Sequence, residues 1–444
     1  MMTLKKGVLI LFAPLFAACA FAESQISLVP DGGATTMSPD VGVIQQQPDN
    51  RDVAVELPAI DTAPADRVID GNKQSDWWNP MFSLRRRLTI DMRLTSAADL
   101  SDFPVALRIP ANTVDPTVAG MAGADVRFAD AAGNALARDI EVWDGQDTSI
   151  VWLKLPKLPI NETAPIYMYY GVQGTPAPAN DRQAVWPAPY AAVWHFANNP
   201  QDATSNHFDG ATVQATFEAG KLGLAAKFNG AAKDHIGLSH GIGIISGAEA
   251  VTESAWVKTE AISTTSFGAI LAVGTADKTG DLGRTQLYIW GEAASYPYGG
   301  QPLRNALYGE INPDEMPGGW DFVASPVDAI TPGQWHYVTV VFDAKYKSTS
   351  AYVDGTMVAG PLETPGHGGG APRPGNWTHT TFPGTPTDRV VIGALEDLSH
   401  GFYDGLIDEL RVETVARSAQ WIAAQAIAVT GDAITLGPEE HAQP

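Results

Sequence analysis

Two segments of the chain, 295–322 and 362–387, gather aromatic side chains among glycine and proline residues. Aromatic rings bind the faces of sugars by stacking, and neighbouring polar groups bond the hydroxyls. Segments of this length without a regular pattern are uncommon and are often functional. They predict a glycan-contacting rim whose candidate ligand-binding residues are Trp320, Trp377, Arg373, Tyr298 and His379. The alternative is that these side chains only pin large loops to the domain beneath them.

The sequence contains none of the short motifs that indicate a familiar catalytic site. A glycosidase needs two carboxylates across the sugar, often as Glu-x-Asp-x-x-Glu, and that pattern does not occur. Gly-x-Ser-x-Gly, His-Glu-x-x-His and phosphate-binding loops are also missing. Asp408 and Glu409 are adjacent, so on a strand they are expected to face opposite sides. His367 and His379 share a segment, but a solvated loop is the simpler interpretation. We therefore expect a protein that is not an enzyme.

The elements that would position such a rim are strands in the C-terminal half, residues 187–437. Apolar and polar residues alternate there with the period of two that indicates strands. Asp354-Gly355 predicts a hairpin turn, and Ser418 marks the start of a short helix over 417–428. The pattern predicts a large two-sheet sandwich whose terminal strands meet.

This half resembles the laminin G and concanavalin A-like lectin superfamily, especially its bacterial laminin-G-like branch. The resemblance implies two curved antiparallel sheets in a jelly-roll arrangement. It rests on short segments in the expected order, among them Val193–Phe196, Gly223 with Ala226–Gly230, Ser254–Lys258, Gly333–Val338, Tyr352–Gly355 and Phe402–Val412.

The same resemblance implies a calcium site that joins the first loop of the domain to its last strand. Carried over residue by residue, the candidate metal ligands are Asp202, Asn206 and Asp408. Calcium takes several oxygen ligands from loops that can wrap around it. The first turn departs from the family, because Thr204–His207 stands where a glycine-rich pattern is common. The alternative is that Asp202 and Asn206 only make the turn and that Asp408 caps loop amides.

Residues 76–186 hold six or so short period-two segments, which predict a smaller β-sandwich. This region resembles the bacterial envelope domain-of-unknown-function 2341 family. The resemblance implies a place in the cell envelope and a lectin-like neighbour, but no chemistry. It rests on Leu100–Val105, Ala124–Phe128, Ile140–Trp143, Val151–Leu153 and Tyr169–Gly171. Glu141 and Asp144 flank Trp143 as in a sugar-binding pair, but alternation favours Trp143 and Trp152 as core residues.

The N-terminus predicts export. Lys5 and Lys6, an apolar run over 7–18 and a small-x-small site at 20–22 are typical of a signal peptide over residues 1–22. Cys19, the single cysteine, leaves a lipid anchor open. Residues 23–75 are predicted to be a disordered linker, and residues 438–444 a tail. The net charge of −22 argues against nucleic acid and leaves carboxylates for divalent cations.

These observations predict an all-β chain with a signal peptide and flexible linker, then a small β-sandwich and a concanavalin A-like jelly-roll sandwich. The expected function is that of a non-catalytic exported protein that binds a glycan or a cell-envelope ligand, with a structural calcium ion. It would be periplasmic, outer-membrane-associated or extracellular. One alternative is a protein-interaction component of a biopolymer-transport-type system, with envelope membrane proteins as partners. The other is a glycoside hydrolase with an unrecognised site.

Overall fold

The computed structural model describes most of the chain after residue 76. The described residues are 77–92, 100–114, 121–144, 147–158, 164–174, 182–239, 243–260, 267–275, 284–291, 302–312, 321–362, 366–367, 380–382, 388–431 and 433–442. They lie within one compact unit, 73–444. The predicted signal peptide and linker lie outside the described residues.

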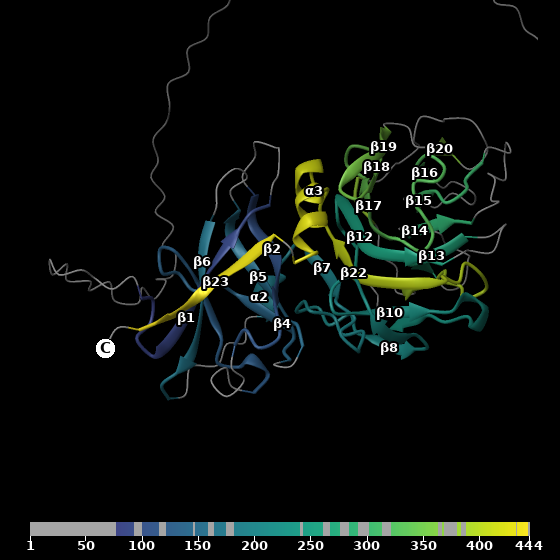
Figure 1. Cartoon of the computed structure of the whole chain (residues 1–444). Helices are drawn as coiled ribbons and strands as arrows, with labels where there is room; N and C mark the ends of the chain where they lie inside the picture. Colours follow the sequence, from purple (N-terminus) through teal and green to yellow (C-terminus); the bar gives the residue numbers. More distant parts are fainter. Residues whose placement is uncertain are drawn as a thin grey trace, which may run out of the picture. The chain divides into compact units, whose positions relative to one another are not determined.

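The first part of the structure is a small sandwich of two antiparallel sheets (Figure 1). One sheet has the strand order β23-β1-β6-β3 and the other has the order β2-β5-β4. Its strands are β1 (Phe82–Ile90), β2 (Leu100–Ile109), β3 (Arg127–Asp130), β4 (Arg138–Val142), β5 (Ser149–Leu158), β6 (Ala164–Val172) and β23 (Ile434–His441). Strand β1 is only partly buried, whereas β2 is buried continuously from Phe103 to Leu107.

The last strand of the chain, β23, returns to this first sandwich and pairs antiparallel with β1. Figure 1 shows it in yellow among the purple and blue strands. Residues 438–441 therefore belong to a strand where the sequence predicts a tail. Pro438 disguises the strand, but proline is tolerated here because β23 lies at the edge of its sheet.

The second part is a larger sandwich of two eight-stranded sheets. In the first sheet β7 pairs with β22, beside the order β19-β18-β17-β12-β22-β10-β9. Its strands are β7 (Tyr190–Trp194), β9 (Thr216–Ala219), β10 (Leu224–Phe228), β12 (Ala250–Thr259), β17 (Trp335–Asp343), β18 (Ser348–Val353), β19 (Thr356–Leu362) and β22 (Gly405–Glu413).

The second sheet of this sandwich has the order β20-β16-β15-β14-β13-β21-β11-β8. Its strands are β8 (Gly210–Val213), β11 (Ile236–Leu238), β13 (Phe267–Thr275), β14 (Arg284–Trp290), β15 (Leu307–Asn312), β16 (Asp321–Ala324), β20 (Gly366–His367) and β21 (Asp388–Ile392). Apolar residues of both sheets, such as Val251 and Leu287, form one core between them. The all-β prediction with two successive sandwiches is thus confirmed.

Short helices complete the structure. Within the described residues, the α-helices are α2 (Arg182–Val185) and α3 (Ala419–Ala428), and the 3-10 helices are Met121–Gly123 and Gly230–Ala232. The predicted helix over 417–428 is confirmed as α3, whose first turn is capped when Ser418 accepts a hydrogen bond from the amide of Trp421. Of the described helices, none has the length and apolar character needed to cross a membrane.

The outer face of the β12–β17–β22 sheet packs against the first sandwich. Trp256 on β12 and Tyr337 on β17 share one apolar cluster with Trp152 on β5. From α3, Trp421 packs its ring edge-on against Phe103 on β2, with the centroids 4.7 Å apart. This shared cluster brings polar residues of the two sandwiches together.

Two local predictions have different outcomes. Asp354-Gly355 forms the predicted hairpin turn between β18 and β19, with positive φ at both residues. The segment 295–322, in contrast, is not irregular throughout, because residues 307–312 form β15 in the middle of a sheet. Tyr308 is buried on that strand.

Candidate functional site

The five residues predicted to contact a glycan are Trp320, Trp377, Arg373, Tyr298 and His379. All five lie outside the described residues. Their part in binding therefore stays a prediction from the sequence.

Two of the predicted calcium ligands, Asp202 and Asn206, shape the turn after β7. The carboxylate of Asp202 accepts hydrogen bonds from the amides of Val193, Thr204 and Phe208 at 2.9–3.0 Å, and from the Thr204 hydroxyl at 2.7 Å. The Asn206 amide group donates to the carbonyl of Ala191 at 2.8 Å. Both side chains thus make the local hydrogen bonds that the turn-forming alternative expects.

The third predicted ligand, Asp408, lies on β22 and has different partners. Its Oδ2 accepts hydrogen bonds from the backbone amides of Lys221 and Leu222, at 2.8 and 2.9 Å. Among the hydrogen bonds of the described residues, Asp408 shares no partner with Asp202 or Asn206. Calcium binding by these three residues stays a prediction.

A row of aromatic rings crosses the face of β13–β16 that is turned away from the sandwich core. Phe322 stacks on Tyr308 and Tyr308 on Tyr288, each with 4.8 Å between centroids, and Tyr288 lies 4.6 Å from Phe267. Trp290 meets Phe267 and Tyr308 edge-on. Strand alternation puts these rings on one side and residues such as Leu287 on the core side. We call this set of five rings the aromatic face.

Polar side chains accompany the rings on the same face. The Tyr288 hydroxyl donates to Glu310 at 3.0 Å, and the Gln286 amide group donates to Glu396 at 2.8 Å. The rings of Tyr288 and Tyr308 are buried, whereas those of Phe267, Trp290 and Phe322 are half-buried. The indole N–H of Trp290 has no acceptor among the described residues. Rings beside carboxylates and amides are the groups with which proteins recognise sugars.

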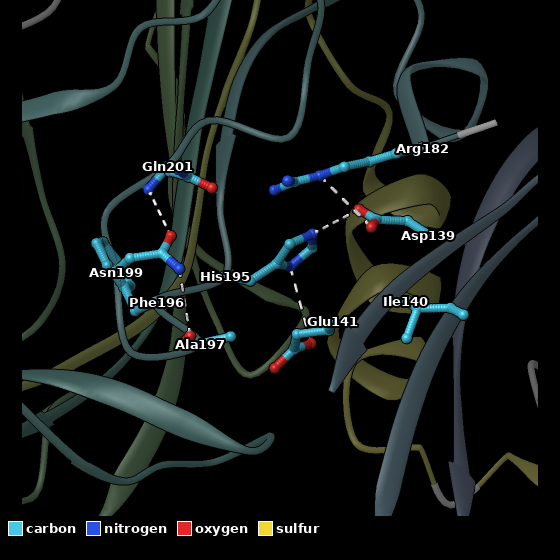
Figure 2. A pocket seen from close by; sticks show the side chains of 9 residues that line it. All are labelled: Asp139, Ile140, Glu141, Arg182, His195, Phe196, Ala197, Asn199 and Gln201. Atoms are coloured by element: carbon cyan, nitrogen blue, oxygen red, sulfur yellow. Dashed lines mark hydrogen bonds and ion pairs between the residues drawn. The ribbon is translucent and has the colours of Figure 1, made fainter. Parts of the chain in front are cut away.

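A second constellation, centred on His195, lies where the two sandwiches share their apolar cluster. His195 follows β7, and its Nδ1 is 2.8 Å from Oε1 of Glu409 on β22. Its Nε2 is 3.2 Å from Oδ2 of Asp139 on β4, which also accepts the indole N–H of Trp186 at 2.9 Å. Figure 2 shows Asp139 between His195 and Arg182. A histidine 3 % exposed is thus held between two carboxylates.

The charges of this constellation are mutually dependent. Burial alone lowers the pKa of His195, but the Glu409 carboxylate and the hydrogen bonds to Asp139 and Glu409 outweigh it and raise the pKa to about 10. For Asp139 the effects are reversed. Burial raises the pKa of this carboxyl, but the hydrogen bond and the charge of His195 outweigh burial, so the pKa lies below its usual value. His195 is therefore a cation at neutral pH when nothing else binds it.

Arg411 adds a fully buried cation. Its Nη2 donates to Oε2 of Glu409 at 3.0 Å. The guanidinium lies over the rings of Trp152 and Trp186, 4.7 and 5.0 Å from their centroids. Rings and carboxylate together replace the water that the arginine loses on burial.

Two further carboxyls lie beside Glu409. Glu141 on β4 accepts the indole N–H of Trp152 at 3.0 Å, and its side chain has no exposed surface. Burial, followed by the charge of Glu409, raises the pKa of Glu141 well above its usual value, and the same two causes raise the pKa of Asp408. Oε1 of Glu141 and Oδ1 of Asp408 have no hydrogen-bond donor in the part of the chain that the structure describes.

A small pocket opens beside this constellation (Figure 2). Its volume is about 70 Å³. It is lined by Asp139, Ile140, Glu141, Arg182, His195, Phe196, Ala197, Asn199 and Gln201. The pocket therefore reaches both Glu141 and His195 from a polar rim.

The sequence prediction missed this constellation, and its expectation for Asp408 and Glu409 is wrong. Ser254 of β12 pairs with Arg411 and Trp256 with Asp408, so β22 has one extra residue, a β-bulge. Glu409 lies at the bulge with a φ of 50°. The alternation of side-chain directions is broken there, so the charges of Asp408 and Glu409 both raise the pKa of Glu141. The available signal was the presence of charged residues within an otherwise apolar strand.

Comparisons with known families find two matches, in the order that the sequence predicts. Residues 122–217 match the family described as "Domain of unknown function (DUF2341)". Residues 230–423 match the family described as "Concanavalin A-like lectin/glucanases superfamily". No curated protein matches the chain significantly.

Several solved structures are also similar. Domain 4 of a GH43 extracellular arabinanase from Geobacillus stearothermophilus, in complex with arabinotriose, is 19% identical with a TM-score of 0.36, over 53% of this chain and 98% of that one. A sialidase CBM40 from Ruminococcus gnavus, bound to α2,3-sialyllactose, is 18% identical with a TM-score of 0.29, over 41% and 84%. A heptameric pentraxin from Limulus polyphemus is 18% identical with a TM-score of 0.27, over 40% and 70%.

The two resemblances predicted from the sequence are confirmed: the chain carries a match to the DUF2341 family followed by a match to the concanavalin A-like lectin/glucanase superfamily.

Proposed function

We propose that this chain is an exported, non-catalytic protein that binds a glycan through its second sandwich. The observation that carries the proposal is the aromatic face on β13–β16, within a domain that matches a lectin/glucanase superfamily. Half-buried Trp290 and Phe322 offer ring surface for stacking. Export rests on the basic, apolar and small-residue pattern of residues 5–22.

Recognition without turnover is supported by the sequence, which lacks the paired-carboxylate motif of a glycosidase on this fold. The carboxylates of the aromatic face are engaged in side-chain hydrogen bonds, Glu310 with Tyr288 and Glu396 with Gln286. Such bonds orient an acceptor for a sugar hydroxyl. The buried constellation around His195 serves no step of this proposal.

The test is a screen of the purified protein against a glycan array and a panel of insoluble polysaccharides. We expect retention on at least one class of glycan and no release of reducing sugar from it. Each binding assay is done with and without calcium, so that the predicted calcium site is tested at the same time. Binding to no glycan under either condition would remove the proposal, and turnover of a polysaccharide would replace it with the hydrolase alternative.

A further inference from the structure

The buried constellation holds more carboxylates than cations. Asp139, Glu141, Asp408 and Glu409 face two fully buried cations, His195 and Arg411. The third cation, Arg182, is 40% exposed and lies 3.5 Å from Asp139 alone. A buried carboxylate without a compensating partner is costly, because the protein interior replaces its lost hydration poorly. The excess of carboxylates over cations is found around Glu141, Asp408 and Glu409.

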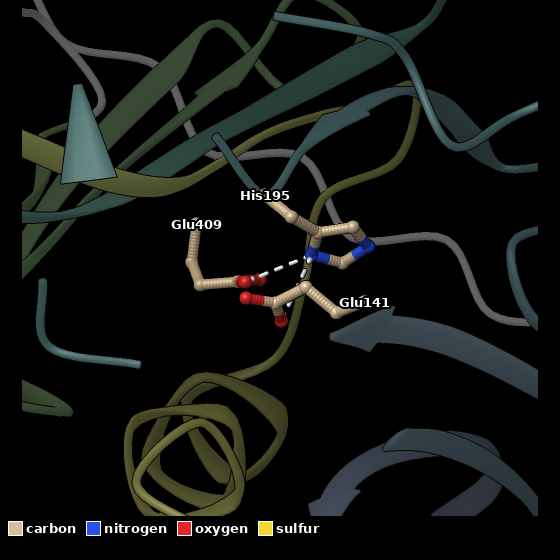
Figure 3. Close-up of side chains that lie close together, drawn as sticks. All are labelled: Glu141, His195 and Glu409. Atoms are coloured by element: carbon tan, nitrogen blue, oxygen red, sulfur yellow. Dashed lines mark hydrogen bonds and ion pairs between the residues drawn. The ribbon is translucent and has the colours of Figure 1, made fainter. Parts of the chain in front are cut away.

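Three side chains converge in this region: Glu141 from β4, Glu409 from β22, and His195 from the residue directly after β7. One possible ligand atom each of Glu141, His195 and Glu409 lies within 4.8 Å of the other two. Figure 3 shows the carboxylates of Glu141 and Glu409 facing each other next to the imidazole ring. Nδ1 of His195 is 2.8 Å from Oε1 of Glu409 and 3.9 Å from Oε2 of Glu141. Ligand atoms around a tetrahedral zinc ion are roughly 3.3 Å apart, so atoms that now lie within 4.8 Å would have to approach one another by at most about 1.5 Å.

The surrounding groups hold each of the three side chains by its other polar atom. The Asp139 carboxylate is hydrogen-bonded to Nε2 of His195. Trp152 donates to Oε2 of Glu141, and Arg411 donates to Oε2 of Glu409. A carboxylate on the far nitrogen of a histidine is the arrangement that orients an imidazole toward a metal. Nδ1 of His195, Oε1 of Glu141 and Oε1 of Glu409 are the atoms that remain.

The second observation that points to a ligand is the state of Glu141 Oε1. Its side chain is completely buried, and this oxygen has no hydrogen-bond donor among the described residues. A Cβ added to Gly223 would lie 2.7 Å from this oxygen, and one added to Gly220 would lie 2.6 Å from Oδ2 of Asp408. The turn between β9 and β10 therefore closes over the carboxylates and keeps Glu141 directed at Glu409.

We propose that Glu141, His195 and Glu409 bind a divalent transition metal ion, of the class of Zn²⁺, Mn²⁺ or Co²⁺, which links β4 of the first sandwich to β7 and β22 of the second. One imidazole nitrogen and two carboxylates suit these ions, whereas calcium takes six to eight oxygens. Asp408 adds negative charge next to the ligands. When the metal binds, Nδ1 of His195 gives up its proton to solvent and bonds the ion through the freed electron pair.

The pocket next to Glu141 and His195 supplies a route to this site. Its volume of about 70 Å³ is enough for roughly two water molecules, which could complete the coordination of the ion. This metal site differs from the predicted calcium site, because it uses neither Asp202 nor Asn206. It is also separate from the aromatic face, so its test does not depend on glycan binding.

The test uses the mature chain with any affinity tag removed. The protein is treated with a chelator, desalted, and titrated with Co²⁺ or Zn²⁺ in the presence of excess calcium. We expect one equivalent of metal per chain, visible d–d absorption bands for Co²⁺, and a higher Tm with Zn²⁺. Glu409→Gln and Glu141→Gln should each weaken binding at least about tenfold and lose the rise in Tm. Glu253→Gln, a change at another buried glutamate, should bind as the wild type does.

X-ray absorption of the Zn²⁺-loaded wild type keeps the test independent of whether a variant folds. We expect one imidazole nitrogen and oxygen ligands around the ion. The proposal is overturned if the wild type retains no metal, if both glutamine variants bind as the wild type does, or if the spectrum shows no imidazole ligand.

Discussion

Nδ1 of His195 lies 2.8 Å from Oε1 of Glu409, although 214 positions separate the two residues in the chain. His195 follows the first strand of the second sandwich, and Glu409 lies at a bulge in the central β22. Asp139 of the first sandwich joins them at 3.2 Å. The contact places a charged, hydrogen-bonded group inside an otherwise apolar junction, where each partner depends on the others.

Arg411 should be indispensable to this junction. Arg411→Met leaves Glu409 buried with one charged partner fewer, so we expect the free energy of unfolding to fall by about 3–5 kcal/mol. Arg304→Met is the matched control, because its ion pair with Asp328 is about half exposed and should contribute little. Urea unfolding followed by tryptophan fluorescence measures both. Equal, small losses in the two variants would show that the junction does not depend on Arg411.

Glu253 should make the stability depend on pH. It points from β12 into the core between the two large sheets, where Thr285 of the opposite sheet donates a hydrogen bond to it. Burial raises its pKa from 4.5 to about 7, against the smaller opposite effect of that hydrogen bond. The folded protein therefore keeps a proton that the unfolded chain loses above pH 4.5, so stability falls as the pH rises from about 4.5 to 7.

Glu253→Gln removes this titration. The wild type should lose about 3 kcal/mol relative to the variant between pH 4.5 and pH 8, with no further change above it. Urea unfolding of both proteins across this range gives the difference directly, and titration of all other groups cancels. Parallel pH curves for the two proteins would contradict the assignment.

The C-terminal strand should be needed for the first sandwich. β23 covers the edge of β1, and its Glu439 and Glu440 bond Tyr170 and Arg85. A chain that ends at Ala433 would expose that edge and invite edge-to-edge association, so we expect a lower Tm and aggregates in size-exclusion chromatography. A chain that ends at Ala442 keeps β23 and should behave as the full chain. A monodisperse Ala433 truncation with unchanged Tm would contradict the assignment of β23.

Local signals in the sequence predicted much of the fold. Alternation marked most strands, Asp354-Gly355 marked a hairpin, and Ser418 marked the start of α3. Each of these signals depends only on residues close together in the sequence, so it can be recognised without knowledge of the tertiary structure. Strand β15 was not predicted because it is short and lies among glycine and proline residues. Strand β23 was not predicted because it contains Gly437-Pro438.

The buried constellation could not be predicted in the same way. Glu141, His195 and Glu409 are far apart in sequence. The pairing of β7 with β22 brings His195 to Glu409, and the packing of the first sandwich on the second adds Glu141. The bulge at Glu409 also breaks the alternation on which the expectation for Asp408 and Glu409 depended. The aromatic face could be predicted only in part, because its rings lie on strands whose outward-facing side is decided by how the strands pair in the sheet.

The most direct test of glycan binding compares two ring deletions on opposite sheets. Trp290→Ala removes a half-buried ring of the aromatic face, and Tyr346→Ala removes a ring that is 72% exposed at the turn after β17. The measurement is the Kd, by calorimetry, for the oligosaccharide that the screen retains best. We predict a loss of at least about tenfold for Trp290→Ala, the order expected for one stacking ring, and no change for Tyr346→Ala. Unchanged affinity in Trp290→Ala, with the variant folded, would contradict the account.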